Sequence, residues 1–167
     1  GSDFTFGDVT LRKPKHDNHE LLGKTKFAGC LGVMKDVKRN KYTQNAKIEA
    51  DCSVDGKEVY KLKSTANTAN WWYDHRISLI DAKTFADYRT EYFKGGKHIK
   101  TIDRSWAPAN LDDPRASYWG YWYGKTNTTG HETMAFIPST ITKVNHKYKA
   151  KNLWSTRTLK KMPKKIK

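Results

Sequence analysis

Histidines and carboxylates that could act as general acids and bases occur at three places in the chain. A ribonuclease-type reaction needs two such groups on one phosphodiester, together with a cation that stabilises the developing charge. The residues of these types are His131 with Glu132, His75 with Arg76, and His98. On a strand, His131 and Glu132 would point to opposite faces and could not act together on one substrate. A small secreted hydrolase is therefore an alternative and not the leading hypothesis.

A second group of possible ligands lies in the stretch HDNHE, residues 16–20, which has two histidines three positions apart. On a helix this spacing could hold a metal ion. The stretch follows Pro14 and lacks the apolar spacing of a helix, so we expect a solvated loop and no metal site. Motifs for zinc proteases, phosphate-binding loops and serine hydrolases are also absent, and we expect no cofactor.

The stretch SYWGYWYG, residues 117–124, contains five aromatic rings. As a strand it would carry rings on both faces, so it is either a covered central strand or a strand with one exposed aromatic face. We expect most of these rings to lie in the core. Trp119, Tyr121 and Tyr123 would share one face, and we expect that face to border a groove where rings stack on sugars or bases.

Positive charge is concentrated at the C-terminal end. The net charge is +15, and residues 133–167 contain ten basic residues and no Asp or Glu. Such a field attracts anionic polymers such as teichoic acid, acidic glycans or nucleic acid. The basic residues that we expect to contact such a polymer are Lys147, Lys149, Lys151, Arg157, Lys160 and Lys161.

Cys30 and Cys52 are the only cysteines, and they do not form a Cys-x-x-Cys motif. We expect a disulfide, which would stabilise the fold by about 3 kcal/mol and indicate an oxidising, extracytoplasmic location. The alternative is a pair of buried thiols in a cytosolic protein.

A chain of 167 residues predicts one domain, here residues 3–150, followed by a basic C-terminal segment, residues 151–167. No apolar stretch approaches the roughly 20 residues of a membrane span, so we expect no transmembrane segment. The sequence does not indicate an oligomeric state.

Two hairpins are expected. Residues 46–64 alternate around Val54-Asp55-Gly56, and a bulged loop there, with Gly56 left-handed, would set Ile48 opposite Leu62 and Ala50 opposite Tyr60. We expect residues 88–106 to form the second hairpin, with its turn at Gly95-Gly96. The alternative for residues 78–96 is a helix.

Other short runs have strand composition, with turn-rich links between them. These runs are residues 3–11, 24–34, 71–80, 117–124, 132–137 and 141–148. The pattern predicts an all-β or β-rich fold, an antiparallel sandwich or barrel of consecutive hairpins with at most one short helix.

The last stretch, KYKAKNLWSTRTLKKMPKKIK, resembles segments of small secreted and cell-surface proteins of lactobacilli and related Gram-positive bacteria. Those segments are rich in lysine, are interrupted by Tyr and Trp, and often contain a Pro-Lys-x-x-Lys-like run. The resemblance implies a location in the cell envelope. The cysteine pair departs from it, since such proteins usually lack cysteine.

The leading hypothesis is thus a secreted or cell-surface binding module for an anionic polymer or another envelope component, with nucleic acid as a possible partner. The alternatives are the small hydrolase and a secreted effector or adhesin that binds a host protein, for which the charge would only steer association.

Overall fold

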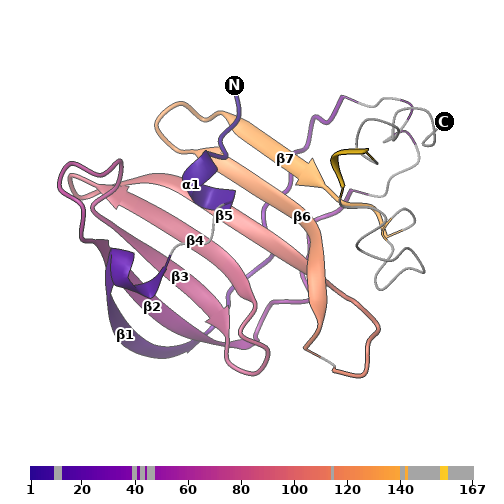
Figure 1. Cartoon of the computed structure of the whole chain (residues 1–167), viewed down its shortest axis with the longest axis horizontal. Helices are drawn as coiled ribbons and strands as arrows, with labels where there is room; N and C mark the ends of the chain where they lie inside the picture. The colour runs from indigo at the N-terminus through magenta and orange to yellow at the C-terminus, as the bar shows by residue number, and fades with distance from the viewer. Residues whose placement is uncertain are drawn as a thin grey trace.

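The computed structural model describes residues 1–9, 13–38, 41, 44, 48–113, 115–139, 142 and 155–157, with only the backbone of Phe6 and Val9. Seven antiparallel strands form one sheet in sequence order (Figure 1). The strands are β1 (Asp17–Lys26), β2 (Glu58–Ala66), β3 (His75–Asp81), β4 (Asp87–Lys94), β5 (Lys97–Pro108), β6 (Ser117–Thr126) and β7 (Glu132–Phe136). A four-residue helix, α1 (Phe6–Val9), and a 3-10 turn, η1 (Pro14–His16), precede them.

This architecture confirms the predicted all-β fold of consecutive antiparallel hairpins. Within the all-β class, these strands form one open sheet. Among the described residues, β1 and β7 are its two edge strands. The predicted boundary at residue 150 lies outside the described residues and stays a prediction.

The hairpin of β4 and β5 turns where it was predicted. Gly95 and Gly96 both have positive φ angles, 55° and 72°, as the commonest two-residue hairpin turn requires. The alternative helix over residues 78–96 is wrong, because this segment forms the end of β3, a turn and β4.

The predicted hairpin of residues 46–64 is wrong in its pairing. The turn is present and Gly56 is left-handed, with a φ angle of 73°. β2 nevertheless pairs with β1, so that Leu62 lies opposite Leu21. Residues 48–52 form no strand, and the backbone N–H of Leu31 donates to the Asp51 carbonyl at 3.0 Å.

Several other runs also differ from expectation. The 3–11 run contains α1, the 24–34 run leaves the sheet after Lys26, and β3 begins only at His75. The expected loop at residues 16–20 is wrong from Asp17 on, where β1 begins. The strands expected at 117–124 and 132–137 are confirmed, whereas the one at 141–148 lies outside the described residues apart from Thr142.

Residues 27–34 and 48–57, which lie between β1 and β2 and which we term the covering segment, pack on one face of the sheet, the loop face. Phe27, Leu31 and Val54 of this segment pack in one cluster with Tyr121 and Tyr123 of β6. Gly32 lies so close to the Tyr123 ring that a side chain there would collide with it. In Figure 1 the segment crosses behind the sheet.

Residues 3–8 lie against the opposite face, which we term the helix face. Here Phe4 packs on a cluster formed by Tyr73, Tyr92, Ile102 and Trp122. Alternation along β6 places Trp122 on this face and its two neighbours on the other. Figure 1 shows α1 in front of the sheet, near β5.

The Cys30–Cys52 disulfide joins the two ends of the covering segment, with a sequence separation of 22. We predict that the double substitution of Cys30 and Cys52 by serine lowers the free energy of unfolding by about 3 kcal/mol, because it frees a loop of this length in the unfolded chain. Urea denaturation of the oxidised wild type and of the variant measures this difference. Equal midpoints would contradict the prediction, and the wild type in reductant should match the variant.

Candidate functional site

The three aromatic residues expected to line a groove do not share one face. Tyr121 and Tyr123 are buried on the loop face, with 5% and 7% of their surface exposed. Ser105 pairs with Tyr121 but Trp106 pairs with Trp119, which leaves Gly120 as an extra residue in β6. This bulge turns Trp119 toward Trp122 of the helix face, with 4.4 Å between the two ring centroids. The prediction of one shared aromatic face is therefore wrong.

Trp119 is the exposed member of that set, with 37% of its surface accessible. Its ring also contacts Trp106, at 5.8 Å between centroids. Of the basic residues expected to bind a polyanion, Arg157 is exposed. The others, Lys147, Lys149, Lys151, Lys160 and Lys161, lie outside the described residues.

The candidate acid and base residues are distributed over separate contacts. His75 and His98 both stack on Phe93, at 4.9 Å and 5.0 Å between ring centroids, so a phenyl ring separates the two imidazoles. His131 Nδ1 lies 2.7 Å from Asp3 Oδ2, near the turn that precedes β7.

The remaining two candidates of this kind are held by other side chains. Glu132 accepts a hydrogen bond from Tyr123 at 2.6 Å, and Arg76 pairs with Asp17 at 3.3 Å. The described residues contain no group of three or more His, Cys, Asp or Glu side chains that could hold a metal ion.

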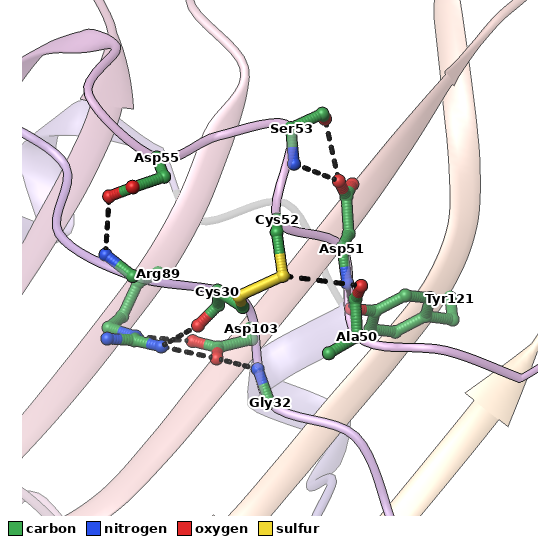
Figure 2. The surroundings of a disulfide bond; sticks show 11 residues. Cys30, Gly32, Ala50, Asp51, Cys52, Ser53, Asp55, Arg89, Asp103 and Tyr121 are labelled. Atoms are coloured by element: carbon green, nitrogen blue, oxygen red, sulfur yellow. Dashed lines mark hydrogen bonds and ion pairs between the residues drawn. A yellow bond between two sulfur atoms is a disulfide. The ribbon is translucent and has the colours of Figure 1, made fainter.

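An ion pair beneath the disulfide fixes the covering segment to the sheet (Figure 2). Arg89 of β4 donates two hydrogen bonds of 2.7 Å to the carboxylate of Asp103 on β5. The same carboxylate accepts the backbone N–H of Gly32 at 2.6 Å, and Arg89 donates to the Cys30 carbonyl at 3.2 Å. Asp103 is 1% exposed, so the charge of this carboxylate is neutralised inside the protein.

A second contact holds the other end of the segment. The backbone N–H of Asp51 donates to the Tyr121 hydroxyl at 3.1 Å, and Ser105 donates to the Asp51 carboxylate at 2.7 Å. Burial would raise the pKa of the Asp51 carboxyl, but hydrogen bonds from Ser53 and Ser105 lower it below its ordinary value. Asp51 is therefore ionised at neutral pH.

A cleft of about 160 Å³ lies between the covering segment and the ends of β4, β5 and β6. One wall comes from the covering segment and the other from the sheet and the residues next to it. The lining residues are Asp51, Ser53, Val54, Lys57, Thr84, Ala86, Tyr88, Trp106, Pro108, Arg115 and Ser117.

The cleft combines aromatic walls with charges of both signs. Lys57 is exposed; its ammonium donates to the Tyr88 hydroxyl at 3.2 Å and lies 5.4 Å from the ring centroid. The Trp106 indole N–H donates to the Asp87 carbonyl at 2.9 Å, which fixes the ring orientation. Arg115 is exposed beside Asp113, at 2.9 Å. Such a site can stack on a flat face, neutralise an anion and accept hydrogen bonds from hydroxyls.

Sequence reasoning missed Lys57, Trp106 and Arg115 because each belongs to a different segment. A local signal existed only for Trp106, which ends the alternating run of the second hairpin. Arg89 and Asp103 had no local signal, since their pairing follows from the register of β4 on β5.

No family model matches this chain, and no curated protein does. Solved structures do share its fold. They include a domain from Vibrio parahaemolyticus described as an "outer membrane lipoprotein-sorting protein domain" (TM-score 0.57, 13% identity) and a LolA superfamily protein from Nitrosomonas europaea (TM-score 0.51, 13% identity). A DUF1329 family protein from Desulfovibrio piger is a third (TM-score 0.56, 12% identity).

The likeness covers 92%, 87% and 95% of this chain but only 52%, 57% and 53% of those three, respectively. The chain thus spans about half the length of each, and the low identity shows a common fold alone. None of the helices in the described part of the chain has the length and hydrophobicity of a membrane span.

The Arg89–Asp103 pair predicts an asymmetric response to substitution. We expect Arg89→Gln to cost about 3 kcal/mol of unfolding free energy, because it leaves a buried carboxylate without its counter-ion. Asp103→Asn should cost roughly half as much, because the neutral amide can still accept from Gly32, while the Arg89 side chain is 23% exposed and reaches water. Urea denaturation measures both; equal losses or the reverse order would contradict this account.

Acid should weaken the fold through Asp51 and Asp81. Burial raises the pKa of each carboxyl, but hydrogen bonds outweigh it and hold the pKa below the ordinary value of 3.8. A lowered pKa in the folded state means that the stabilisation is complete above the unfolded pKa and is lost as the pH falls through the folded value. We expect the urea midpoint to drop between about pH 5 and about pH 3. The Asp51→Asn/Asp81→Asn variant should show a shallower drop, and an unchanged slope would contradict the assignment.

Proposed function

We propose that this chain is an extracytoplasmic binding module for an anionic polymer, and that the cleft beside the disulfide holds one unit of it. The observation that carries the proposal is the meeting of Trp106, Lys57 and Arg115 at one cleft. The cleft contains none of the residues that the sequence predicted for polymer binding, but it brings an aromatic ring and two cations together from three different segments.

The lining favours a glycan or polyol chain that carries phosphate or sulfate. Trp106 offers a flat apolar surface to a sugar ring. Lys57 and Arg115 line the cleft and would contact the anionic group, with Arg115 shared between that group and Asp113. The ionised Asp51 would accept hydrogen bonds from hydroxyls. A carboxylate in the lining repels a bare phosphate chain but suits a ligand that has both hydroxyls and anions.

The charge of the C-terminal end would strengthen the attraction of the same polymer. Residues 133–167 carry ten basic residues and no acidic one, which gives a long-range attraction for a polyanion. Each neutralised phosphate releases counter-ions, so the affinity should depend strongly on salt.

Three observations support a location outside the cytoplasm. The disulfide belongs to an oxidising compartment. One solved structure with this fold is described as an "outer membrane lipoprotein-sorting protein domain". The C-terminal segment also resembles lysine-rich cell-surface proteins.

The hydrolase and the host-binding alternatives lack a comparable observation. Phe93 stands between His75 and His98, and His131 is engaged with Asp3 at another part of the sheet. No described feature favours a host protein over a polymer.

Binding of teichoic acid and of a sulfated glycan, measured by calorimetry at several salt concentrations, tests the proposal. We expect Lys57→Gln/Arg115→Gln to weaken binding about tenfold, which corresponds to roughly 0.7 kcal/mol for each exposed charge. Affinity should also fall steeply as salt rises.

The matched control is Lys61→Gln/Lys97→Gln, which removes two exposed lysines that do not line the cleft. An equal loss in the control would show that only the overall charge matters and would overturn the cleft assignment. Absence of binding to both polymers would overturn the proposed function. Tighter binding of DNA or RNA would overturn the choice of a hydroxyl-rich polymer.

A further inference from the structure

Residues 3–8, which we term the N-terminal strap, lie against the helix face through side chains of opposite character. Phe4 is apolar, whereas Asp3 and Asp8 are acidic, and all three contact residues of the sheet or of the turn before β7. Figure 1 shows this part of the chain crossing in front of the sheet near β5.

The acidic end of the strap neutralises a buried lysine. Lys100 Nζ lies 2.6 Å from Asp8 Oδ2, and the two side chains are 6% and 0% exposed. The same ammonium lies 4.8 Å from the Trp72 ring and 5.6 Å from the Tyr92 ring. An ammonium between two aromatic faces, with one anion against it, is a ready-made site for a carboxylate.

The apolar end of the strap occupies a notch above Gly124. A Cβ atom at Gly124 would come within 2.8 Å of the Phe4 ring, so this close approach depends on glycine. The Phe4 ring packs edge-on against Trp122 at 5.6 Å, and Arg104 lies over the Trp122 ring at 4.7 Å. The notch therefore accepts a flat apolar group.

The strap leaves one polar atom of this site unused. Trp122 Nε1 is buried and has no hydrogen-bond partner among the described residues. An unsatisfied buried polar atom typically costs about 1–3 kcal/mol. The strap therefore covers the Trp122 indole N–H without supplying an acceptor for it, so it fills the site incompletely.

We propose that the N-terminal strap is a displaceable occupant of a second ligand site, which takes a small organic acid with a flat apolar group. The acid would replace Asp8 on Lys100, and its apolar group would replace Phe4 above Gly124. This site lies on the helix face, opposite the covering segment that forms the cleft wall, so it does not rest on the proposed function.

Asp3 sets how firmly the strap is held. Its carboxylate accepts hydrogen bonds from Thr126 and Thr133 and lies 2.7 Å from His131 Nδ1. Burial would raise the pKa of the Asp3 carboxyl, but these hydrogen bonds lower it, so Asp3 is ionised at neutral pH. The strap is thus anchored at Asp3, while Phe4 and Asp8 compete with a ligand.

The test uses the full chain and 4-phenylbutyrate, a carboxylate with one phenyl ring, as the probe. Phe4→Ala frees the notch and keeps the Lys100–Asp8 ion pair. Asp8→Asn removes the competing charge, while its side-chain oxygen can still accept the hydrogen bond from the Thr5 backbone N–H. We expect each variant to bind the probe at least about tenfold more tightly than the wild type, because less of the site is self-occupied. Calorimetry measures the affinities, and near-ultraviolet circular dichroism checks that the fold is intact.

Asp112→Asn, which changes an exposed acid outside the strap, is the matched control and should bind like the wild type. Adding Lys100→Gln to Phe4→Ala should abolish the gain. If Asp8→Asn proves unstable, the probe should raise its melting temperature more than that of the wild type, since a ligand stabilises the state that it binds.

The proposal is overturned if folded Phe4→Ala binds no more tightly than the wild type, or if the control gains equally. It is also overturned if Lys100→Gln leaves the gain intact. Polymer binding at the cleft should be unchanged in the strap variants, which separates a failure here from a failure of the proposed function.

Discussion

The Arg89–Asp103 ion pair is the interaction on which the loop face depends. The Arg89 Nε and Nη2 atoms each donate to one oxygen of the Asp103 carboxylate. The carboxylate also accepts the Gly32 N–H, and Nη2 also donates to the Cys30 carbonyl. The covering segment is thereby seated on the sheet through backbone groups, with the disulfide tying its two ends. Asp51 and Ser53 flank Cys52 and line the cleft, so the same contacts fix the position of one cleft wall.

A small aromatic core suits such an arrangement. Aliphatic residues are few, and Tyr, Trp and buried ion pairs fill the space on both faces. Burying a charge is costly unless it is paired, and the buried cations Lys100 and Arg104 each have an aspartate partner. The pairing of Lys100 differs from the rest because its partner comes from the strap and not from a strand. That difference makes the helix face a second place where an external anion could compete.

Local signals in the sequence were enough for part of the fold. Gly95-Gly96, the alternating runs around it and the aromatic run of β6 predicted strands that the structure contains, and the two cysteines form the expected disulfide. Pairing between distant segments was not predictable in this way. The 58–66 strand was assigned to its sequence neighbour, whereas it pairs with residues 17–26 across a long segment. The bulge at Gly120 likewise depends on the register of β5 on β6, so alternation alone put Trp119 on the wrong face.

Residue-resolved hydrogen exchange of the Gly32 and Asp51 amides tests the central claim most directly. If the ion pair seats the covering segment, Arg89→Gln should speed the exchange of both amides while the amides of the β4–β5 ladder stay protected. Protection of Gly32 and Asp51 that equals that of the wild type would contradict the account, because the segment would then hold its place without the pair.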